Sequence, residues 1–73
     1  MINNVIKLKA KIIENGYNVD DFAPVVGMCP TTLRKKLRGV QDFKLGETLD
    51  IKKRLSLNNK EYVDIFFGSE LEL

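Results

Sequence analysis

Turn-forming residues divide this chain into short segments, and this division restricts what it can fold into. Asn15-Gly16, Gly27, Gly39 and Gly68 interrupt the sequence at short intervals, and glycine and asparagine tolerate the left-handed conformation that ends helices. Between these points apolar residues recur at spacings of three and four, which is the period of an amphipathic helix. The sequence therefore predicts an all-α fold of five short helices, over residues 3–14, 18–27, 30–38, 44–55 and 58–67.

The length and composition indicate one small domain. With 73 residues, of which 44% are hydrophobic and 30% charged, the chain can build one core but not two. Residues 1–73 are therefore taken as a single domain with a tail at 68–73. No apolar stretch approaches the roughly 18 residues of a transmembrane helix, and the first residues lack the order of a secretory signal. We expect a cytoplasmic protein that does not associate with membranes.

The residue inventory argues against catalysis and metal binding. The chain has no histidine, one cysteine, Cys29, and only two serines, Ser56 and Ser69. Histidine is the commonest general base, and the usual zinc sites need several cysteines or histidines. We expect no enzyme activity, no metal, no cofactor and no small-molecule substrate. Cys29 is expected to be a small buried or half-buried residue at a turn.

Capping residues and prolines predict where the helices begin. Asn18 and Asn58 are candidate N-caps, and Glu61 follows Asn58 at the spacing of a capping box. Pro30 stands at the first position of its helix, where proline fits, whereas Pro24 lies inside the preceding helix and is expected to shorten or bend it. The apolar stripes are predicted at Ile2, Val5, Ile6, Ile12 and Ile13 in the first helix and at Leu45, Leu49, Ile51 and Leu55 in the fourth.

Residues 18–39 have the layout of a helix-turn-helix, in which a tight turn containing glycine joins two short helices. Helices that cross steeply need a small residue where they touch and a residue with positive φ in the turn. Ala23 and Gly27 fit these two requirements. Leu33 follows six residues after the glycine and is placed to fill the core between the two helices.

The second helix of this motif is strongly basic on its predicted outer side. Leu33 and Leu37 define the inward face, so Thr31, Lys35 and Arg38 project from the opposite face. Basic residues dominate this helix and the loop after it, whereas residues 61–73 contain only acidic charged residues. A cationic helix with threonines near its start suits the major groove of DNA, where it can reach base edges and neutralise phosphates.

The run GMCPTTLRKKLRG at 27–39 resembles the turn and recognition helix of the lambda-repressor-like, Cro/C1-type helix-turn-helix family of bacteria and their phages, especially its small phage-encoded members. The resemblance extends over about residues 4–67 and includes Phe43-Lys-Leu and Ile65-Phe-Phe. It implies a five-helix lambda-repressor-like domain that binds double-stranded DNA sequence-specifically as a homodimer. The implied function is regulation of transcription, as a repressor for example, in the cytoplasm at the bacterial nucleoid.

The resemblance also implies which residues contact DNA. Threonines and a lysine near the start of the recognition helix match the family's base-reading positions, and its arginines match positions that face phosphate or an outer base. Cys29 and Pro30 depart from the family, which usually has a serine cap and a polar contact residue there. Proline cannot hydrogen-bond a base, although it can pack against a thymine methyl group. The expected contacts are Asn18, Pro30, Thr31, Thr32, Arg34, Lys35, Arg38 and Lys44, with the recognition helix 30–38 in the major groove.

The carboxy-terminal end has two interpretations. Its apolar residues either form a dimer surface or cap the core of the monomer. Its acidic and apolar character also supports a different class of function, in which a protein-interaction module of the same fold binds another regulator, as an antirepressor does. Salt-sensitive binding to duplex DNA would distinguish the first function from the second. The dimer surface would comprise Phe66, Phe67, Leu71 and Leu73.

Overall fold

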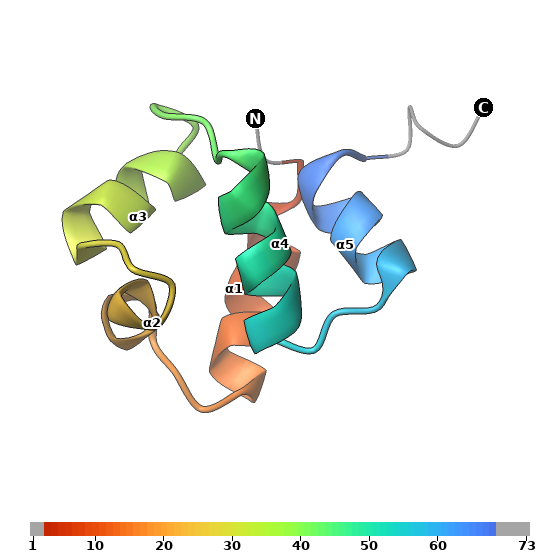
Figure 1. Ribbon diagram of the computed structural model, residues 1–73, viewed down its shortest axis with the longest axis horizontal. Helices are drawn as coiled ribbons and strands as arrows, with labels where there is room; N and C mark the ends of the chain where they lie inside the picture. Colours follow the sequence, from red (N-terminus) through yellow and green to blue (C-terminus); the bar gives the residue numbers. More distant parts are fainter. Residues whose placement is uncertain (1–2, 69–73) are drawn as a thin grey trace.

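Five short α-helices account for the regular structure of residues 3–68, as the spacing of the turn residues predicts. The structure is a computed structural model that describes residues 3–68, and this part of the chain contains no strand. Figure 1 shows α2 and α3 at one end of the molecule, α5 at the other, and α4 in front of α1. None of the described helices has the length and apolar character needed to cross a membrane. The helices are α1 (Val5–Glu14), α2 (Val19–Val25), α3 (Pro30–Leu37), α4 (Leu45–Arg54) and α5 (Asn59–Phe66).

Asparagine side chains cap three of the helices, including the two for which the sequence predicts a cap. Oδ1 of Asn18 accepts a hydrogen bond from the backbone N–H of Asp21 at 2.7 Å. Asn58 accepts one from Glu61 at 2.8 Å, and the Glu61 carboxylate accepts one from the Asn58 N–H at 3.0 Å. Asn4 caps α1 in the same way as Asn18 caps α2. These acceptors satisfy N–H groups that the first turn of a helix leaves unpaired.

The first four helices end in the same hydrogen-bonded turn, the Schellman motif. After α2, the N–H of Gly27 donates to the Pro24 carbonyl at 3.1 Å, and the N–H of Met28 donates to the Ala23 carbonyl at 2.9 Å. The motif needs a residue with positive φ, and Gly27 has a φ of 74°. At the end of α4 the corresponding residue is Ser56, which adopts a φ of 54° although it is not glycine.

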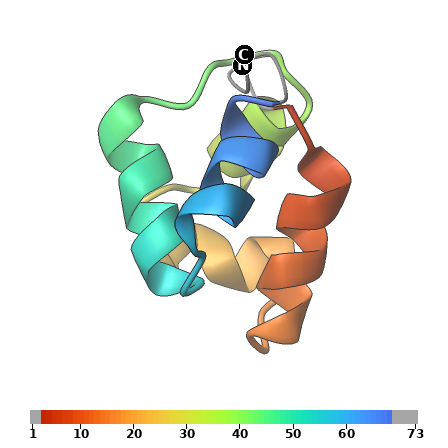
Figure 2. The ribbon, with the colours of Figure 1, turned by 90° about the vertical axis from the view of Figure 1, so that its right-hand side faces the viewer.

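The core lies where the five helices meet. α2 packs against α3, and α1 packs against both α2 and α5. Figure 2 shows α5 between α1 and α4. Ala23 and Leu33 are fully buried, as the helix-turn-helix interpretation predicts. The buried apolar residues are Leu8, Ile12, Phe22, Ala23, Leu33, Leu37, Ile51, Leu55, Leu57, Ile65 and Phe66.

The apolar stripe predicted for α1 is wrong in part. Leu8 and Ile12 are buried, whereas Ile6 and Ile13 are 79% and 68% exposed. Ile6 and Ile13 lie seven residues apart, so they form a second stripe with helical spacing on another face. Periodicity alone does not choose between two such stripes, and the packing of α1 against α2 and α5 selects the one with Leu8. Ile2 lies outside the described residues.

The stripe predicted for α4 needs a similar correction. Leu45 and Leu49 are exposed, whereas Thr48 is buried beside Ile51. The Thr48 hydroxyl donates to the Leu45 carbonyl at 2.7 Å and lies 2.8 Å from the hydroxyl of Tyr62. A buried polar group that is hydrogen-bonded in this way costs little. Thr48 thus occupies a core position that its polarity hides in the sequence.

The ends of the described chain are tied together. The backbone N–H groups of Asn3 and Asn4 both donate to the carbonyl of Ile65, each at 2.9 Å. The side-chain amide of Asn3 also donates to the carbonyl of Asp64 at 3.0 Å. These bonds fix the start of α1 against the last turn of α5.

Candidate nucleic-acid interface

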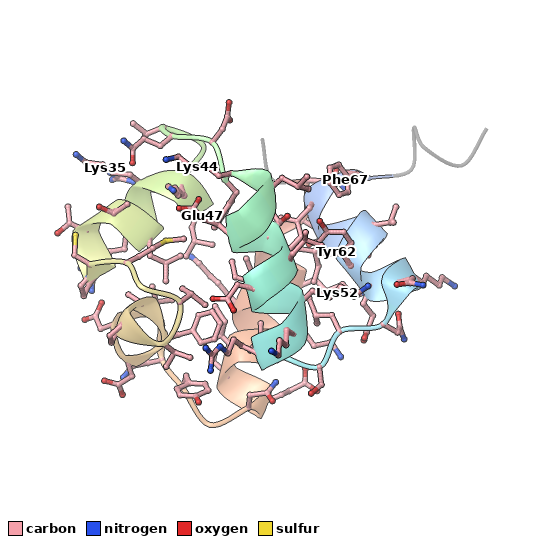
Figure 3. All side chains as sticks on the ribbon, viewed as in Figure 1. Lys35, Lys44, Glu47, Lys52, Tyr62 and Phe67 are labelled. Carbon is pink, nitrogen blue, oxygen red and sulfur yellow. The ribbon has the colours of Figure 1, made fainter. Side chains whose placement is uncertain are left out.

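The packing of α2 against α3 leaves one face of α3 exposed at the surface. Leu33 and Leu37 are buried in the core, and Thr31, Lys35 and Arg38 are exposed on the other side of the helix. Figure 3 shows Lys35 pointing away from the body of the domain, at the opposite end from Phe67. The inward and outward faces of α3 are therefore those that the helical repeat predicts.

Three exposed cations form what we call the cationic face: Lys35 from α3, Arg38 at its C-cap, and Lys44 from the loop before α4. None of the three has an ion-pair partner within residues 3–68. Figure 3 shows Lys35 and Lys44 at the same end of the molecule. The charges of Lys35 and Arg38 are available to an anionic partner, while Lys44 also contributes to the lowered pKa of Glu47.

Arg34 differs from these cations because it is already paired. Its guanidinium forms an ion pair with the carboxylate of Asp20 at the start of α2, and both side chains are about half exposed. An exposed ion pair is weak, so a stronger anion can compete for the arginine. Asp20 nevertheless lowers the positive potential beside α3.

Lys36 does not belong to the outer side of α3, although residues 34–38 are basic almost throughout. Only 6% of Lys36 is exposed, and its Nζ lies 2.5 Å from Oε1 of Glu47 and 6.0 Å from the ring centroid of Phe43. Glu47 also accepts a hydrogen bond from the backbone N–H of Lys44 at 2.9 Å. Burial raises the pKa of Glu47, but the hydrogen bonds from Lys36 and Lys44 lower it more, so the carboxyl group has a net pKa below its usual value. Lys36 therefore joins α3 to α4.

The two threonines of α3 have different surroundings. Thr31 is exposed, whereas Thr32 is half-buried and its hydroxyl lies 3.1 Å from Sγ of Cys29. The expectation that Cys29 is buried or half-buried is wrong, since this residue is exposed. The hydrogen bond with Thr32 lowers the pKa of the Cys29 thiol. Pro30 occupies the first position of α3, as predicted, and is half-buried. Of the two threonines, Thr31 therefore has the more accessible hydroxyl.

Asn18 lies exposed at the start of α2. Its Oδ1 is engaged in capping the helix through the N–H of Asp21. The amide nitrogen of an asparagine side chain carries two further donors, which suit a phosphate oxygen. Asn18 can therefore cap α2 and contact an anion at the same time.

A groove of about 300 Å³ lies on one side of α3. One of its residues, Lys9, comes from α1 and has no ion-pair partner within the described residues. Sequence reasoning missed Lys9 because it lies outside the helix-turn-helix motif, and only the packing of the helices brings it beside α3. The groove is lined by Lys9, Val19, Thr31, Arg34, Leu37 and Arg38.

At the carboxy-terminal end, the two phenylalanines of the predicted dimer surface have different environments. Phe66 is 4% exposed, and its ring centroid lies 5.5 Å from those of Phe43 and Tyr62. Phe66 therefore caps the core of the monomer. Phe67 is 37% exposed and remains available to a partner. The other two residues of that surface, Leu71 and Leu73, lie outside the described residues.

The acidic residues of α5 are paired with lysines of α1. Lys7 Nζ lies 3.0 Å from a carboxylate oxygen of Asp64, and Lys11 Nζ lies 2.6 Å from one of Glu61. The hydrogen bond with Glu61 raises the pKa of Lys11, and the same bond lowers the pKa of Glu61. The described part of this end is thus less acidic toward solvent than its sequence indicates.

The described side chains suit binding to an anionic surface better than holding a metal ion. Within residues 3–68 no group of three or more acidic or cysteine side chains is placed to bind a metal. The unpaired cations and the exposed Thr31 hydroxyl surround one helix instead. Comparisons with protein-family models, with curated proteins and with solved structures gave no match.

Proposed function

We propose that this protein binds double-stranded DNA through α3 and regulates transcription by occupying its site. The observation that carries the proposal is the exposed face of α3, where Lys35 and Arg38 have no ion-pair partner within residues 3–68. An α-helix fits the major groove, which is about 12 Å wide. Thr31 near the start of α3 would reach base edges, while the cations neutralise phosphates.

The positions of the polar residues beside α3 support this orientation. A helix in the major groove has a phosphate backbone on each side. Lys44 lies in the loop toward α4, and Asn18 and Arg34 lie on the side of α2. Each strand would then meet at least one donor, which fixes the register of the helix along the groove.

The resemblance of residues 27–39 to Cro/C1-type proteins supports the regulatory part of the proposal. It suggests a bacterial or phage regulator that binds paired half-sites as a homodimer. Of the residues expected to form the dimer surface, Phe67 is described by the structure and exposed, and it lies at the carboxy-terminal end of α5, away from α3. No catalytic step is involved, because occupancy of the DNA alone changes access to a promoter.

A fluorescence anisotropy titration of a labelled random-sequence duplex at several salt concentrations tests the proposal. For the wild-type protein, log K should fall steeply with log salt. The Lys35→Ala/Arg38→Ala variant should flatten that slope by about two units if each residue neutralises one phosphate. Lys60→Ala is the matched control, because Lys60 is exposed on α5 without an ion-pair partner in the described residues. Equal binding by the wild type and the double variant would exclude this use of α3.

A second function, binding another protein through the carboxy-terminal end, is favoured by one observation, the exposure of Phe67. The pairing of Glu61 and Asp64 with lysines of α1 weakens it. A salt-tolerant complex that Phe67→Ala abolishes, together with no affinity for DNA at low salt, would establish this alternative over the first.

A further inference from the structure

The groove beside α3 draws its walls from three helices. Lys9 comes from α1 and Val19 from α2, whereas α3 supplies Thr31, Arg34 and Leu37, and Arg38 is the residue that caps its carboxy-terminal end. Of the apolar members, Leu37 belongs to the buried core, and Val19 is partly buried against it. Cationic and hydroxyl groups therefore surround a partly apolar surface within one hollow of about 300 Å³.

Positive charge predominates in this groove. Lys9 and Arg38 have no ion-pair partner within residues 3–68, and Arg34 is paired with Asp20 alone. The groove thus contains three cations, of which only Arg34 is paired with a carboxylate. A phosphodiester has matching chemistry, because its phosphate oxygens accept charge-assisted hydrogen bonds and its sugar presents C–H groups to apolar side chains.

The groove also lies on the correct side of α3 to meet a DNA strand. By the helical repeat, Arg34 and Leu37 are displaced from Thr31 toward one flank of α3, and Lys36 is displaced toward the other. Lys36 contacts Glu47 of α4, so that flank faces the loop containing Lys44. The groove therefore opens on the flank opposite Lys44, where the second strand bordering the major groove would run.

We propose that this groove seats a backbone phosphate of bound DNA, and that Lys9 of α1 is a phosphate-contacting residue together with Arg38. The inference rests on the proposed function, because it assigns the occupant of a site beside the helix that enters the major groove. On this flank of α3 the charge of Arg34 is already compensated by Asp20, so Lys9 supplies uncompensated positive charge there. The DNA-binding surface would then comprise α1 as well as the helix-turn-helix.

The test compares Lys9→Gln with Lys60→Gln in the anisotropy titration of a labelled random-sequence duplex. Both lysines are exposed and lack ion-pair partners in the described residues, so both variants should keep the wild-type melting temperature. Lys9→Gln should lower the slope of log K against log salt by about one unit and weaken binding about fivefold at 0.15 M salt. Lys60→Gln should match the wild type, and Lys9→Arg should restore the slope.

Two results would overturn the inference in distinguishable ways. An unchanged slope in Lys9→Gln, with a flattened slope in Lys35→Ala/Arg38→Ala, would remove Lys9 from the interface and leave the proposed function intact. Absence of salt-dependent binding by the wild type would remove both. Inorganic phosphate at matched ionic strength provides a further arm of the test. If Lys9→Gln weakens the binding of free phosphate, measured directly in the absence of DNA, without changing the duplex slope, the groove is a site for free phosphate and not for DNA.

Discussion

At the scale of single residues, Lys35 and Lys36 are neighbours in sequence with opposite roles. Lys35 is exposed, whereas Lys36 is buried and paired with Glu47 at 2.5 Å. A buried lysine is costly unless a partner compensates its charge. The helical repeat places Lys36 near Leu33 and so indicates its burial, but the identity of Glu47 as its partner depends on how α4 packs. The sequence therefore leaves Lys36 off the outer face of the helix, but it could not identify the group that compensates its charge.

Removing either member of this pair should have unequal effects on stability. Glu47→Gln leaves a buried ammonium group without a charged partner, and should lower the free energy of unfolding by about 2 kcal/mol. Lys36→Met replaces the ammonium with an apolar group of similar length, and should change stability by less than about 1 kcal/mol. Urea unfolding at pH 7 measures both. Equal losses in the two variants would show that the pair contributes mainly through its own attraction.

At the scale of elements, helix ends were more predictable from the sequence than helix faces. Caps such as Asn18 and Asn58 act through hydrogen bonds within four residues, so local sequence determines them. The buried face of a helix depends on the neighbouring helices, and in α1 two different apolar stripes had helical spacing. The contact between α2 and α3 was the exception, because the spacing of Ala23, Gly27 and Leu33 predicts both the turn and the buried residues.

The ion pair between α2 and α3 gives a prediction at this scale. Asp20→Asn removes a negative charge beside the cationic face and frees Arg34, so it should strengthen duplex binding and raise the salt slope by up to about one unit. Asp21→Asn is the matched control, because Asp21 is an exposed acid in the same turn of α2 without an ion pair in the described residues. Weaker binding by Asp20→Asn would mean that the pair holds Arg34 in its binding position.

At the scale of the whole molecule, ion pairing concentrates the uncompensated positive charge at the α3 end, which the composition does not indicate. The lysines that face α5 are neutralised by Asp64 and Glu61, whereas those beside α3 have no such partners in the described residues. The net charge of +2 therefore understates the positive potential at the α3 end. Lys9 belongs to that end only because α1 packs beside the motif, and no local pattern in the sequence reveals this placement.

Two carboxylates with lowered pKa values predict how the stability of the domain depends on pH. The pKa values of Glu47 and Glu61 are lowered in the folded state, relative to an ordinary value of 4.5. A group with a depressed folded pKa stabilises the protein above its unfolded pKa and loses that contribution as pH falls through its folded pKa. The melting temperature should therefore fall as the pH is lowered from about 5 to 3.

Thermal unfolding followed by circular dichroism across this range measures the effect. Glu61→Gln should have a shallower acid dependence than the wild type, because it no longer carries the titrating carboxyl group that pairs with Lys11. A melting temperature independent of pH between 5 and 3 would contradict the role of these carboxylates.

The hydrogen bonds between the start of α1 and the end of α5 have a consequence for how the domain opens. One carbonyl, that of Ile65, holds the N–H groups of both Asn3 and Asn4. Fraying of the last turn of α5 would remove the acceptor for two amides at the other end of the described chain. The two ends therefore open together as one cooperative unit, and exchange of the amides of Asn3 and Asn4 with solvent reports on the integrity of α5.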